Sequence, residues 1–264
     1  MSVILQISDP HFGTEVPEVV EALVRMATGL APDLVVLSGD ITQRARDAQF
    51  EAARAFVDRI GAPVLAVPGN HDIPLMNLWA RALHPYAGHR ASFGEALEPG
   101  FENREMLVLG VNTTRARRHK DGEVDAAQVQ RVAERLSRAS ADQLRVVVVH
   151  QPIEVKRPQD EPDRLIGHMA AQRAWAAAGA DVVMGGHIHL PYVMALPGLA
   201  RAMWAVQAGT AVSNRVRRGV PNSVNVLRWT AREAVCVVEQ WDHAGTTQAF
   251  ERKLTTPLQV ARGA

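Results

Sequence analysis

Short apolar, strand-like runs recur along the first two thirds of this chain, and five of them are followed directly by a polar fragment. Asp9 and Asp40 are 31 residues apart, and Asn70 follows 30 residues later. Each interval is close to the length of one strand–helix–strand unit, which places successive strands parallel and brings their carboxyl ends to one edge. The spacing therefore predicts a parallel α/β core with its polar fragments on one rim. These fragments are Asp9-x-His11, Gly39-Asp40, Gly69-Asn70-His71-Asp72, His150 and Gly186-His187-x-His189.

Hydrophobic periodicity and end signals predict the elements between these fragments. Apolar runs of strand length are expected to form the sheet, and segments with helical spacing are expected to cover it. Asp125 with Gln128 three residues later resembles a capping box that opens a helix. The expected strands are residues 3–7, 34–37, 64–67, 106–111, 145–149 and 181–184, and the expected helices are residues 17–30, 47–60, 125–138 and 172–178.

The pattern changes after residue 190, where short runs separated by turns replace the helices. The runs at 192–196, 203–207, 223–227 and 234–238 indicate antiparallel strands that complete a second sheet. We expect residues 1–264 to form a single domain. Within it, the proline- and glycine-rich segment 74–101 is a candidate lid inserted beside the third fragment, and residues 250–264 are expected to form an irregular tail.

Composition narrows the functional classes. An apolar content of 47% is enough for a well-buried core, and a net charge of +1 indicates neither a membrane nor extended nucleic acid as a partner. Cys236 is the only cysteine, so an intrachain disulfide and a cysteine-based metal site are excluded. No signal-like segment and no apolar run of the roughly 20 residues that span a bilayer is visible. We therefore expect a cytoplasmic protein. The sequence is compatible with a monomer and with a homo-oligomer.

The polar fragments combine carboxylate, imidazole and amide oxygen without sulfur, a ligand set that suits Mn²⁺, Fe or Zn²⁺. Asp9 and His11 are two residues apart and so can face one ion, and His187 and His189 repeat that spacing. Asp40 can offer one carboxylate oxygen to each of two ions. Each fragment alone is explained as well by loop or turn chemistry. Their conjunction at five strand ends favours a site for two metal ions.

In this order, the fragments resemble the signature of calcineurin-like metallophosphoesterases, over roughly residues 3–210. That resemblance implies an α/β fold, a four-layer α/β/β/α sandwich of two mixed sheets with flanking helices. It also implies a ligand set for two ions, with Asp40 shared between them. The first ion would be held by Asp9, His11, Asp40 and His189, and the second by Asp40, Asn70, His150 and His187.

The resemblance further implies catalytic roles for three residues of the third fragment. His71 matches the family's proton donor or transition-state stabiliser, and Asp72 would orient its ring. Asn70 would bind the phosphate as well as a metal ion. The fourth fragment departs from the family's frequent His-His-Pro, because it continues His150-Gln151-Pro152. That difference affects the expected substrate preference rather than metal binding.

The opening residues 7–12 and the run 38–42 most resemble bacterial class III cyclic-nucleotide phosphodiesterases and glycerophosphodiesterases. The expected reaction is hydrolysis of a small phosphodiester, with 3′,5′-cyclic nucleotides as one candidate, by attack of a metal-bound hydroxide. A phosphomonoesterase, a nuclease and a non-catalytic scaffold with this fold are the alternatives. Two arginine clusters, at residues 115–118 and 215–218, fit either solvated loops or a positive mouth that attracts anionic substrates.

Overall fold

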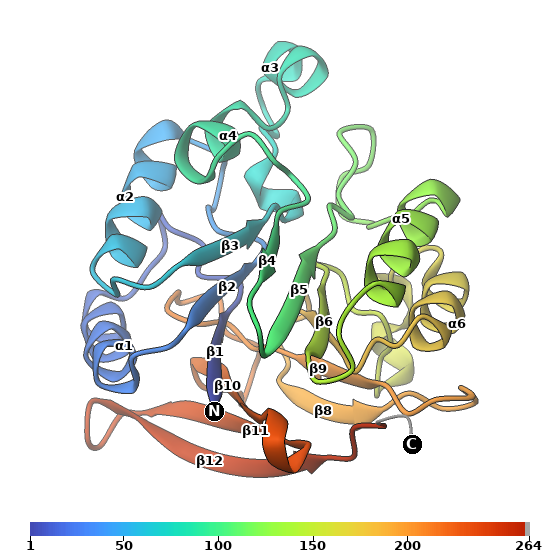
Figure 1. Ribbon diagram of the computed structural model, residues 1–264. Helices are drawn as coiled ribbons and strands as arrows, with labels where there is room; N and C mark the ends of the chain where they lie inside the picture. The colour runs from blue at the N-terminus through green and yellow to red at the C-terminus, as the bar shows by residue number, and fades with distance from the viewer. Residues whose placement is uncertain (262–264) are drawn as a thin grey trace.

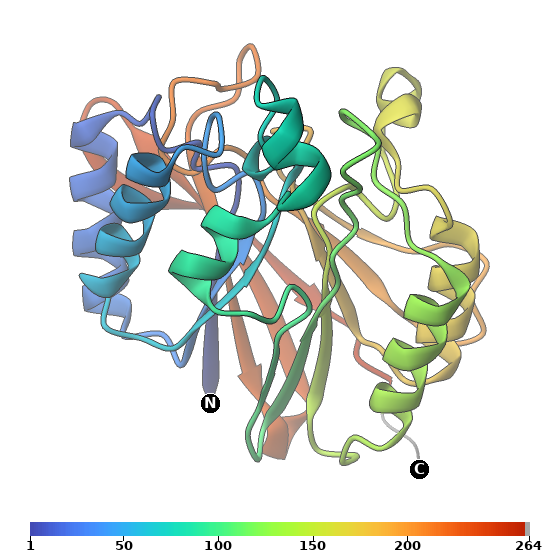
Figure 2. The ribbon, with the colours of Figure 1, turned by 90° about the horizontal axis from the view of Figure 1, so that it is seen from above.

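Two six-stranded sheets pack face to face in the computed structural model, which describes residues 1–261, and helices cover both outer faces (Figure 1). This is the four-layer α/β/β/α sandwich that the sequence predicted. Figure 2 shows the helices on the two sides of the paired sheets from above. Among the described residues, no helix combines the length and the apolar character needed to cross a bilayer.

The first sheet has the strand order β12-β11-β10-β1-β2-β3. Strands β1, β2 and β3 are parallel, because helix α1 (Pro17–Leu30) and helix α2 (Asp47–Asp58) provide the crossovers between them. The remaining strands add to the free edge of β1 in antiparallel order. The bounds of this sheet are β1 (Ser2–Ile7), β2 (Leu34–Ser38), β3 (Val64–Val67), β10 (Ser223–Thr230), β11 (Val235–Ala244) and β12 (Ala249–Leu258).

The second sheet has the order β4-β5-β6-β7-β9-β8, with parallel inner strands and antiparallel edges. Its outer face is covered by α5 (Ala126–Ser137) and α6 (His168–Ala177). The predicted capping box of α5 is confirmed, since Asp125 accepts the backbone N–H of Gln128. Helix α6 begins earlier than expected, directly after Gly167. The strands are β4 (Gly100–Glu102), β5 (Met106–Gly110), β6 (Leu144–Val148), β7 (Val182–Gly185), β8 (Tyr192–Ala195) and β9 (Trp204–Gln207).

Buried apolar side chains form one layer between the sheets and one beneath the helices of each outer face. The layer between the sheets joins Val36 of the first sheet to Val146 of the second, with Trp229 beside them. Because successive residues of a strand point to opposite faces, the neighbours of these residues pack outward against the helices. The long β-branched runs seen in the sequence are thus explained by strands that are buried on both faces.

One expectation about the later strands is wrong. The sequence analysis assigned all four runs after residue 190 to a second sheet, but only β8 and β9 join it, and β9 is parallel to β7. Strands β10 and β11 return to the first sheet beside β1. The pairing partner of a strand is chosen by the edge that the rest of the fold leaves open, which the local pattern does not encode.

The expected irregular tail is also wrong over most of its length. Residues Ala249–Leu258 form β12, which pairs with β11 along its whole length at the edge of the sheet. The segment carries charged residues and Pro257, and an edge strand tolerates both. Phe250 and Leu258 are buried and hold the two ends of the strand against the core. Residues 262–264 of the expected tail lie outside the described residues.

The segment 74–101 contains two short helices, α3 (Leu78–Leu83) and α4 (Ala87–Phe93). Helix α4 packs closely on α2 at Gly88. A Cβ at this position would come within 2.5 Å of the Phe50 ring, so no larger side chain fits there. Helix α3 buries none of its side chains. Its neighbourhood exposes four large apolar residues, namely Met76, Leu78, Trp79 and Leu83.

We predict that Phe250→Ala lowers the free energy of unfolding by about 3 kcal/mol, since it removes a buried aromatic ring and leaves a cavity. Thr255→Ala is the matched control, because Thr255 is exposed on the same strand and surface changes usually stay within about 0.5 kcal/mol. Urea denaturation followed by circular dichroism measures both. Equal, small effects would mean that β12 does not pack against the core.

Candidate metal centre

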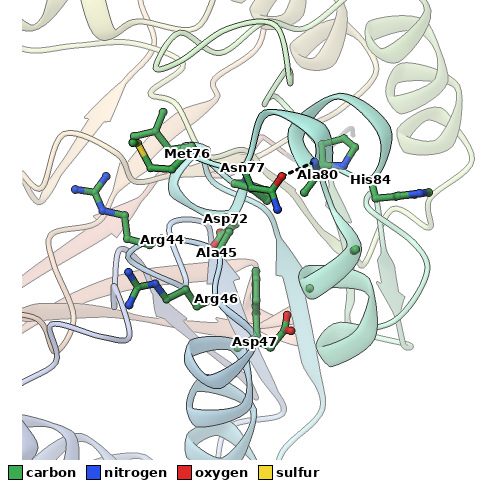
Figure 3. A pocket seen from close by; sticks show the side chains of 15 residues that line it. Arg44, Ala45, Arg46, Asp47, Asp72, Met76, Asn77, Ala80 and His84 are labelled. Atoms are coloured by element: carbon green, nitrogen blue, oxygen red, sulfur yellow. Dashed lines mark hydrogen bonds between the residues drawn. The ribbon is translucent and has the colours of Figure 1, made fainter.

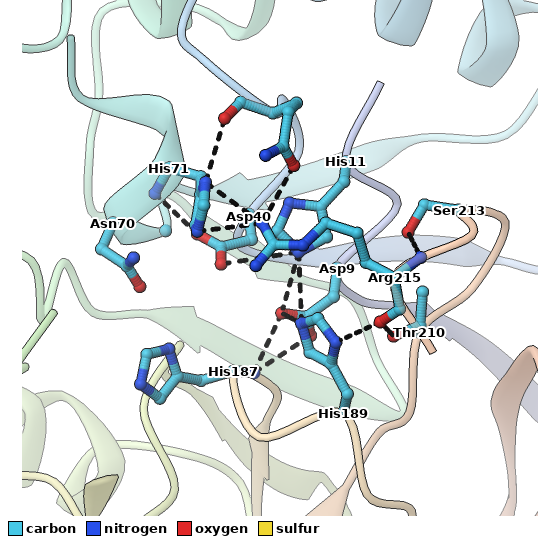
Figure 4. Close-up of polar contacts among 12 residues, drawn as sticks. Asp9, His11, Asp40, Asn70, His71, His187, His189, Thr210, Ser213 and Arg215 are labelled. Carbon is cyan, nitrogen blue, oxygen red and sulfur yellow. Dashed lines mark hydrogen bonds and ion pairs between the residues drawn. The ribbon is translucent and has the colours of Figure 1, made fainter. Parts of the chain in front are cut away.

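The carboxyl ends of five strands meet at one rim of the sandwich and carry the polar fragments. Asp9 follows β1, Asp40 follows β2, and Asn70 opens the short 3₁₀ helix η1 (Asn70–Asp72) after β3. His150 and His187 follow β6 and β7 of the second sheet. Side chains from both sheets therefore point into one site (Figure 4).

The backbone of this site is unusual. Its residues Asp9, His11, Asp40, His187 and His189 all have positive φ angles, between 44° and 74°. Residues other than glycine rarely adopt this left-handed region, and such outliers cluster at functional sites, where the surrounding structure imposes them. Backbone hydrogen bonds link the turns to one another: the Asp9 N–H donates to the Gly39 carbonyl and the His11 N–H to the Asp40 carbonyl.

Two glycines are required because the fragments approach so closely. A Cβ on Gly186 would lie 1.9 Å from the Ser8 Oγ, and one on Gly69 would lie 2.0 Å from the Asp40 backbone nitrogen. Both distances are well below contact, so neither position accepts a side chain without displacing a neighbouring fragment. The glycines seen in the third and fifth fragments thus serve the packing of the rim.

A first group of side chains is formed by Asp9, His11, Asp40 and His189, whose ligand atoms all lie within 4.8 Å of one another. His189 Nε2 is 3.2 Å from Asp9 Oδ1 and 3.2 Å from His11 Nε2. His11 Nε2 is also 3.8 Å from Asp40 Oδ2. Two imidazole nitrogens and two carboxylates facing one point could hold a metal ion.

A second group contains Asp40, His150 and His187, again within 4.8 Å. His150 Nε2 lies 3.2 Å from Asp40 Oδ1 and 3.3 Å from the amide oxygen of Asn70. Asp40 thus belongs to both groups, and Asn70 borders the second. Both ring nitrogens of His187 are buried without a hydrogen-bond partner among the described residues. A buried nitrogen needs a partner, so this donor set fits a bound cation.

Burial and neighbouring charges shift the pKa values of the ligand side chains. Burial lowers the pKa of His11 to about 3, so its imidazole stays neutral and keeps a lone pair. Burial opposes the charge of Asp9, yet His189 and, to a smaller extent, His150 together lower the pKa to about 2. In the same way, although burial disfavours ionisation, His150 holds the pKa of Asp40 well below its usual range.

The interaction between His150 and Asp40 also shifts the pKa of His150. Burial lowers the pKa of this imidazole, but the Asp40 carboxylate outweighs burial and raises the pKa to about 9. A proton on His150 therefore offsets part of the negative charge of Asp40 near pH 7. The same proton has to leave before the ring nitrogen that faces Asp40 can bind a metal ion.

His71 and Asp72 of the third fragment lie outside both groups. His71 donates its backbone N–H to Asp40 Oδ1 at 2.8 Å, and its Nδ1 is 3.0 Å from the carbonyl of Gln43. The ring is thus oriented by Gln43, and the expectation that Asp72 orients it is wrong. Asp72 instead accepts hydrogen bonds from Gly69, Ile41 and Thr42, which ties the third fragment to the turn after Asp40.

The two arginine clusters differ in their surroundings. Arg117 and Arg118 form ion pairs with Glu123, as expected for a solvated loop. Arg215 lies inside the site: its guanidinium is 3.1 Å from His71 Nε2, and its backbone carbonyl is 2.5 Å from His189 Nδ1 (Figure 4). A cavity of about 540 Å³ opens between this residue and the two groups.

The strand-end pattern did not find three residues of the site. Asp163 lies 3.6 Å from His187 at the end of the 3₁₀ helix η2 (Pro158–Asp163), and Lys120 forms an ion pair with it. Gln43 lies at the His71 ring. None of the three follows a strand directly, so the strand-end pattern could not find them. His84 lines a separate cavity beneath α3, and His89 is buried in α4.

The chain matches the family model of the calcineurin-like phosphoesterases over residues 2–191 and belongs to that family. It is 28% identical over 124 residues to a probable cyclic nucleotide phosphodiesterase of Synechococcus sp., covering 46% of this chain and 43% of that protein. It is also 28% identical over 132 residues to the glycerophosphodiester phosphodiesterase GpdQ of Enterobacter lignolyticus, covering 50% and 46%. The chain thus spans about half the length of these relatives.

A crystal structure of a dimetal phosphatase from Danio rerio is similar in fold, with a TM-score of 0.69 over 98% of this chain and 99% of that one. The sequence identity is 11%, so this likeness shows the fold alone. Family membership supports a phosphoester hydrolase, and the two groups of ligand atoms agree with metal binding.

We predict that the affinity for Mn²⁺ rises with pH, up to about pH 9, because His150 must lose its proton to bind an ion. One proton released per ion corresponds to about a tenfold gain per pH unit. Isothermal titration calorimetry in buffers of different ionisation enthalpy counts the protons released. A pH-independent affinity with no proton release would rule out this linkage.

Proposed function

We propose that this protein is a dinuclear metal-dependent phosphodiesterase that hydrolyses small phosphodiesters, with 3′,5′-cyclic nucleotides as one candidate substrate. The observation that supports this most is the pair of ligand groups sharing Asp40. The names of the two curated relatives add the preference for diesters, one a cyclic nucleotide phosphodiesterase and one a glycerophosphodiesterase. A cytoplasmic location and the lack of a membrane or extended nucleic-acid partner stay predictions from the sequence.

In this proposal the two groups of side chains divide the ions between them. Asp9, His11, Asp40 and His189 hold one, and Asp40, Asn70, His150 and His187 hold the other. Mn, Fe and Zn all suit these ligands. When bound, such ions polarise a phosphoryl oxygen and lower the pKa of water, so that hydrolysis proceeds near neutral pH. The Asn70 amide N–H donates to a non-bridging phosphate oxygen while its own oxygen faces the metal.

His71 and Arg215 act on the other side of the phosphoryl group. An arginine can only donate and a carbonyl can only accept, so the contacts of His71 place its hydrogen on Nδ1 and leave Nε2 as an acceptor for Arg215. An anionic substrate that attracts Arg215 would free Nε2 of His71. Once Nε2 has taken up a proton from water, the ring can stabilise the departing alkoxide by donating that proton to it.

Charge pairing in the cavity makes Arg215 the cation most suited to contact the substrate. Lys120 pairs with Asp163 and Arg217 pairs with Asp160, so their charges are already compensated. Among the described residues, the contacts of the Arg215 side chain are with neutral Gln43 and with the His71 ring. A guanidinium binds phosphate oxygens in a two-pronged way. The same feature also favours a phosphomonoester, which carries more negative charge, so a monoesterase is the second candidate.

We keep the proposal that the inserted segment 74–101 serves as a lid, because its Leu75 lines a hollow together with Asn70 and His71 of the site. A cavity of about 830 Å³ lies beneath α3, with Arg44 on one side and Met76 and Asn77 above it (Figure 3). Helix α3 is tied to a neighbouring loop, because Arg81 donates to the carbonyl of Arg118. The exposed side chains of α3 leave the tip of the segment free to contact a substrate.

A substrate panel tests the proposed function. The Mn²⁺-loaded protein is assayed with 3′,5′-cyclic AMP, a glycerophosphodiester, a chromogenic diester, the matching monoester and single-stranded DNA. We expect the highest kcat/KM for a small diester. A preference for the monoester would replace the diesterase with a phosphatase, and cleavage of DNA would indicate a nuclease. Hydrolysis of none, together with no bound metal, would favour the scaffold.

We predict that His71→Ala lowers kcat on the preferred substrate by about 10²- to 10⁴-fold, the usual contribution of a positioned acid–base group. The metal content should stay at the wild-type value, because His71 belongs to neither ligand group. Steady-state kinetics and elemental analysis measure the two quantities. His71 would lose the proposed role if the variant turned over at the wild-type rate.

A further inference from the structure

Asp163 lies against a side chain of the second ligand group. Its Oδ1 is 3.6 Å from His187 Nε2, and the two side chains are 17% and 6% exposed. This carboxylate comes from η2, far in sequence from the strand ends that carry the ligands. Asp163 is not among the residues whose ligand atoms lie within 4.8 Å of one another in the second group. Its position is therefore beside a ligand rather than at the ion.

Lys120 contacts Asp163, and Gln151 contacts the backbone of Lys120. The Lys120 ammonium forms an ion pair with Asp163 Oδ1. The backbone carbonyl of Lys120 accepts a hydrogen bond from Gln151 Nε2 at 3.1 Å, and Thr113 donates to Gln151 Oε1 at 2.6 Å. Gln151 is fully buried, and Gly122 packs so closely on it that a Cβ there would clash. The loop that carries Lys120 is thus fixed from inside the protein.

We propose that Asp163 is a positioning residue for His187: when the second metal ion binds the lone pair of Nδ1, the carboxylate 3.6 Å from Nε2 accepts the N–H of Nε2 and fixes the ring. An imidazole that binds a metal through one nitrogen commonly donates the other N–H to a carboxylate, which fixes the ring and its tautomer. The contact with Asp163 and an ion at Nδ1 together give each buried nitrogen of His187 a partner. The role rests on the metal centre of the proposed function.

The proposal also gives Gln151 a structural purpose. This residue stands where the family frequently has a second histidine after His150. Its amide reaches neither ligand group through the hydrogen bonds it makes, which go to Thr113 and Lys120. In this chain, Gln151 supports the loop of Lys120, and Lys120 in turn supports Asp163. The glutamine that replaces the family's second histidine thus supports the Lys120–Asp163 pair beside His187.

The test is the binding of Mn²⁺ by isothermal titration calorimetry. His187→Ala and His11→Ala first identify which of the two binding events belongs to which ligand group. Asp163→Ala is then expected to weaken the His187 event by about 10- to 100-fold, the usual cost of losing such a partner, and to leave the other event unchanged. Asp163→Asn should restore part of the affinity, because its amide oxygen can still accept the Nε2 hydrogen.

Glu161→Ala is the matched control, since Glu161 lies in the same 3₁₀ helix and pairs with Arg164 rather than with His187. Wild-type binding by Asp163→Ala would overturn the proposal. So would an equal loss in both binding events, which would indicate a general structural role. A further loss when Asp163→Ala is added to His187→Ala would make Asp163 a direct ligand instead. Fewer than two binding events in the wild type would overturn the metal centre itself, and this role with it.

Discussion

The apolar layer between the two sheets is the contact on which the metal centre depends. It packs β1, β2 and β3 of one sheet against β5, β6 and β7 of the other. The ligands are divided between the two sheets: Asp9 and Asp40 follow strands of the first, whereas His150 and His187 follow strands of the second. Neither sheet has a complete ligand group for the second ion. Burial of apolar area contributes about 25 cal/mol per Å². This free energy brings the two carboxylates and the two imidazoles of these residues together.

That free energy offsets two costs at the rim. Five ligand residues occupy the left-handed backbone region, and each such residue costs of the order of 1–3 kcal/mol. The carboxylates of Asp9 and Asp40 are buried as well, and buried charges are stable only when they are paired. Protonated imidazoles provide the pairing near pH 7, as the raised pKa of His150 indicates. A bound metal ion would replace those protons and would balance the negative charge of the two carboxylates more fully.

Much of this arrangement was predictable from residues close together in the chain. The positions of Asp9, Asp40, Asn70, His150 and His187 after apolar runs predicted a common rim, and parallel crossovers brought them there. Contacts between side chains far apart in the sequence were not predictable. Arg215 reaches His71 across 144 residues of sequence, and Asp163 reaches His187 from a loop without a strand-end pattern. The role of Asp72 was misassigned for the same reason, because the partner of the His71 ring comes from Gln43.

By itself, the sequence determined the parallel pairing of the early strands and the ligand types, since hydrophobic period and spacing are local properties of the chain. The four layers followed from the resemblance to the family. Tertiary structure alone decided which open edge received β10, β11 and β12. It also decided which of two arginine clusters faces the cavity, and which carboxylate lies beside His187. The physical reason is common to all three. A strand edge, a guanidinium and a buried ring nitrogen each need a hydrogen-bonding or charged partner. Which partner each one finds depends on the groups that the rest of the fold leaves nearby without one.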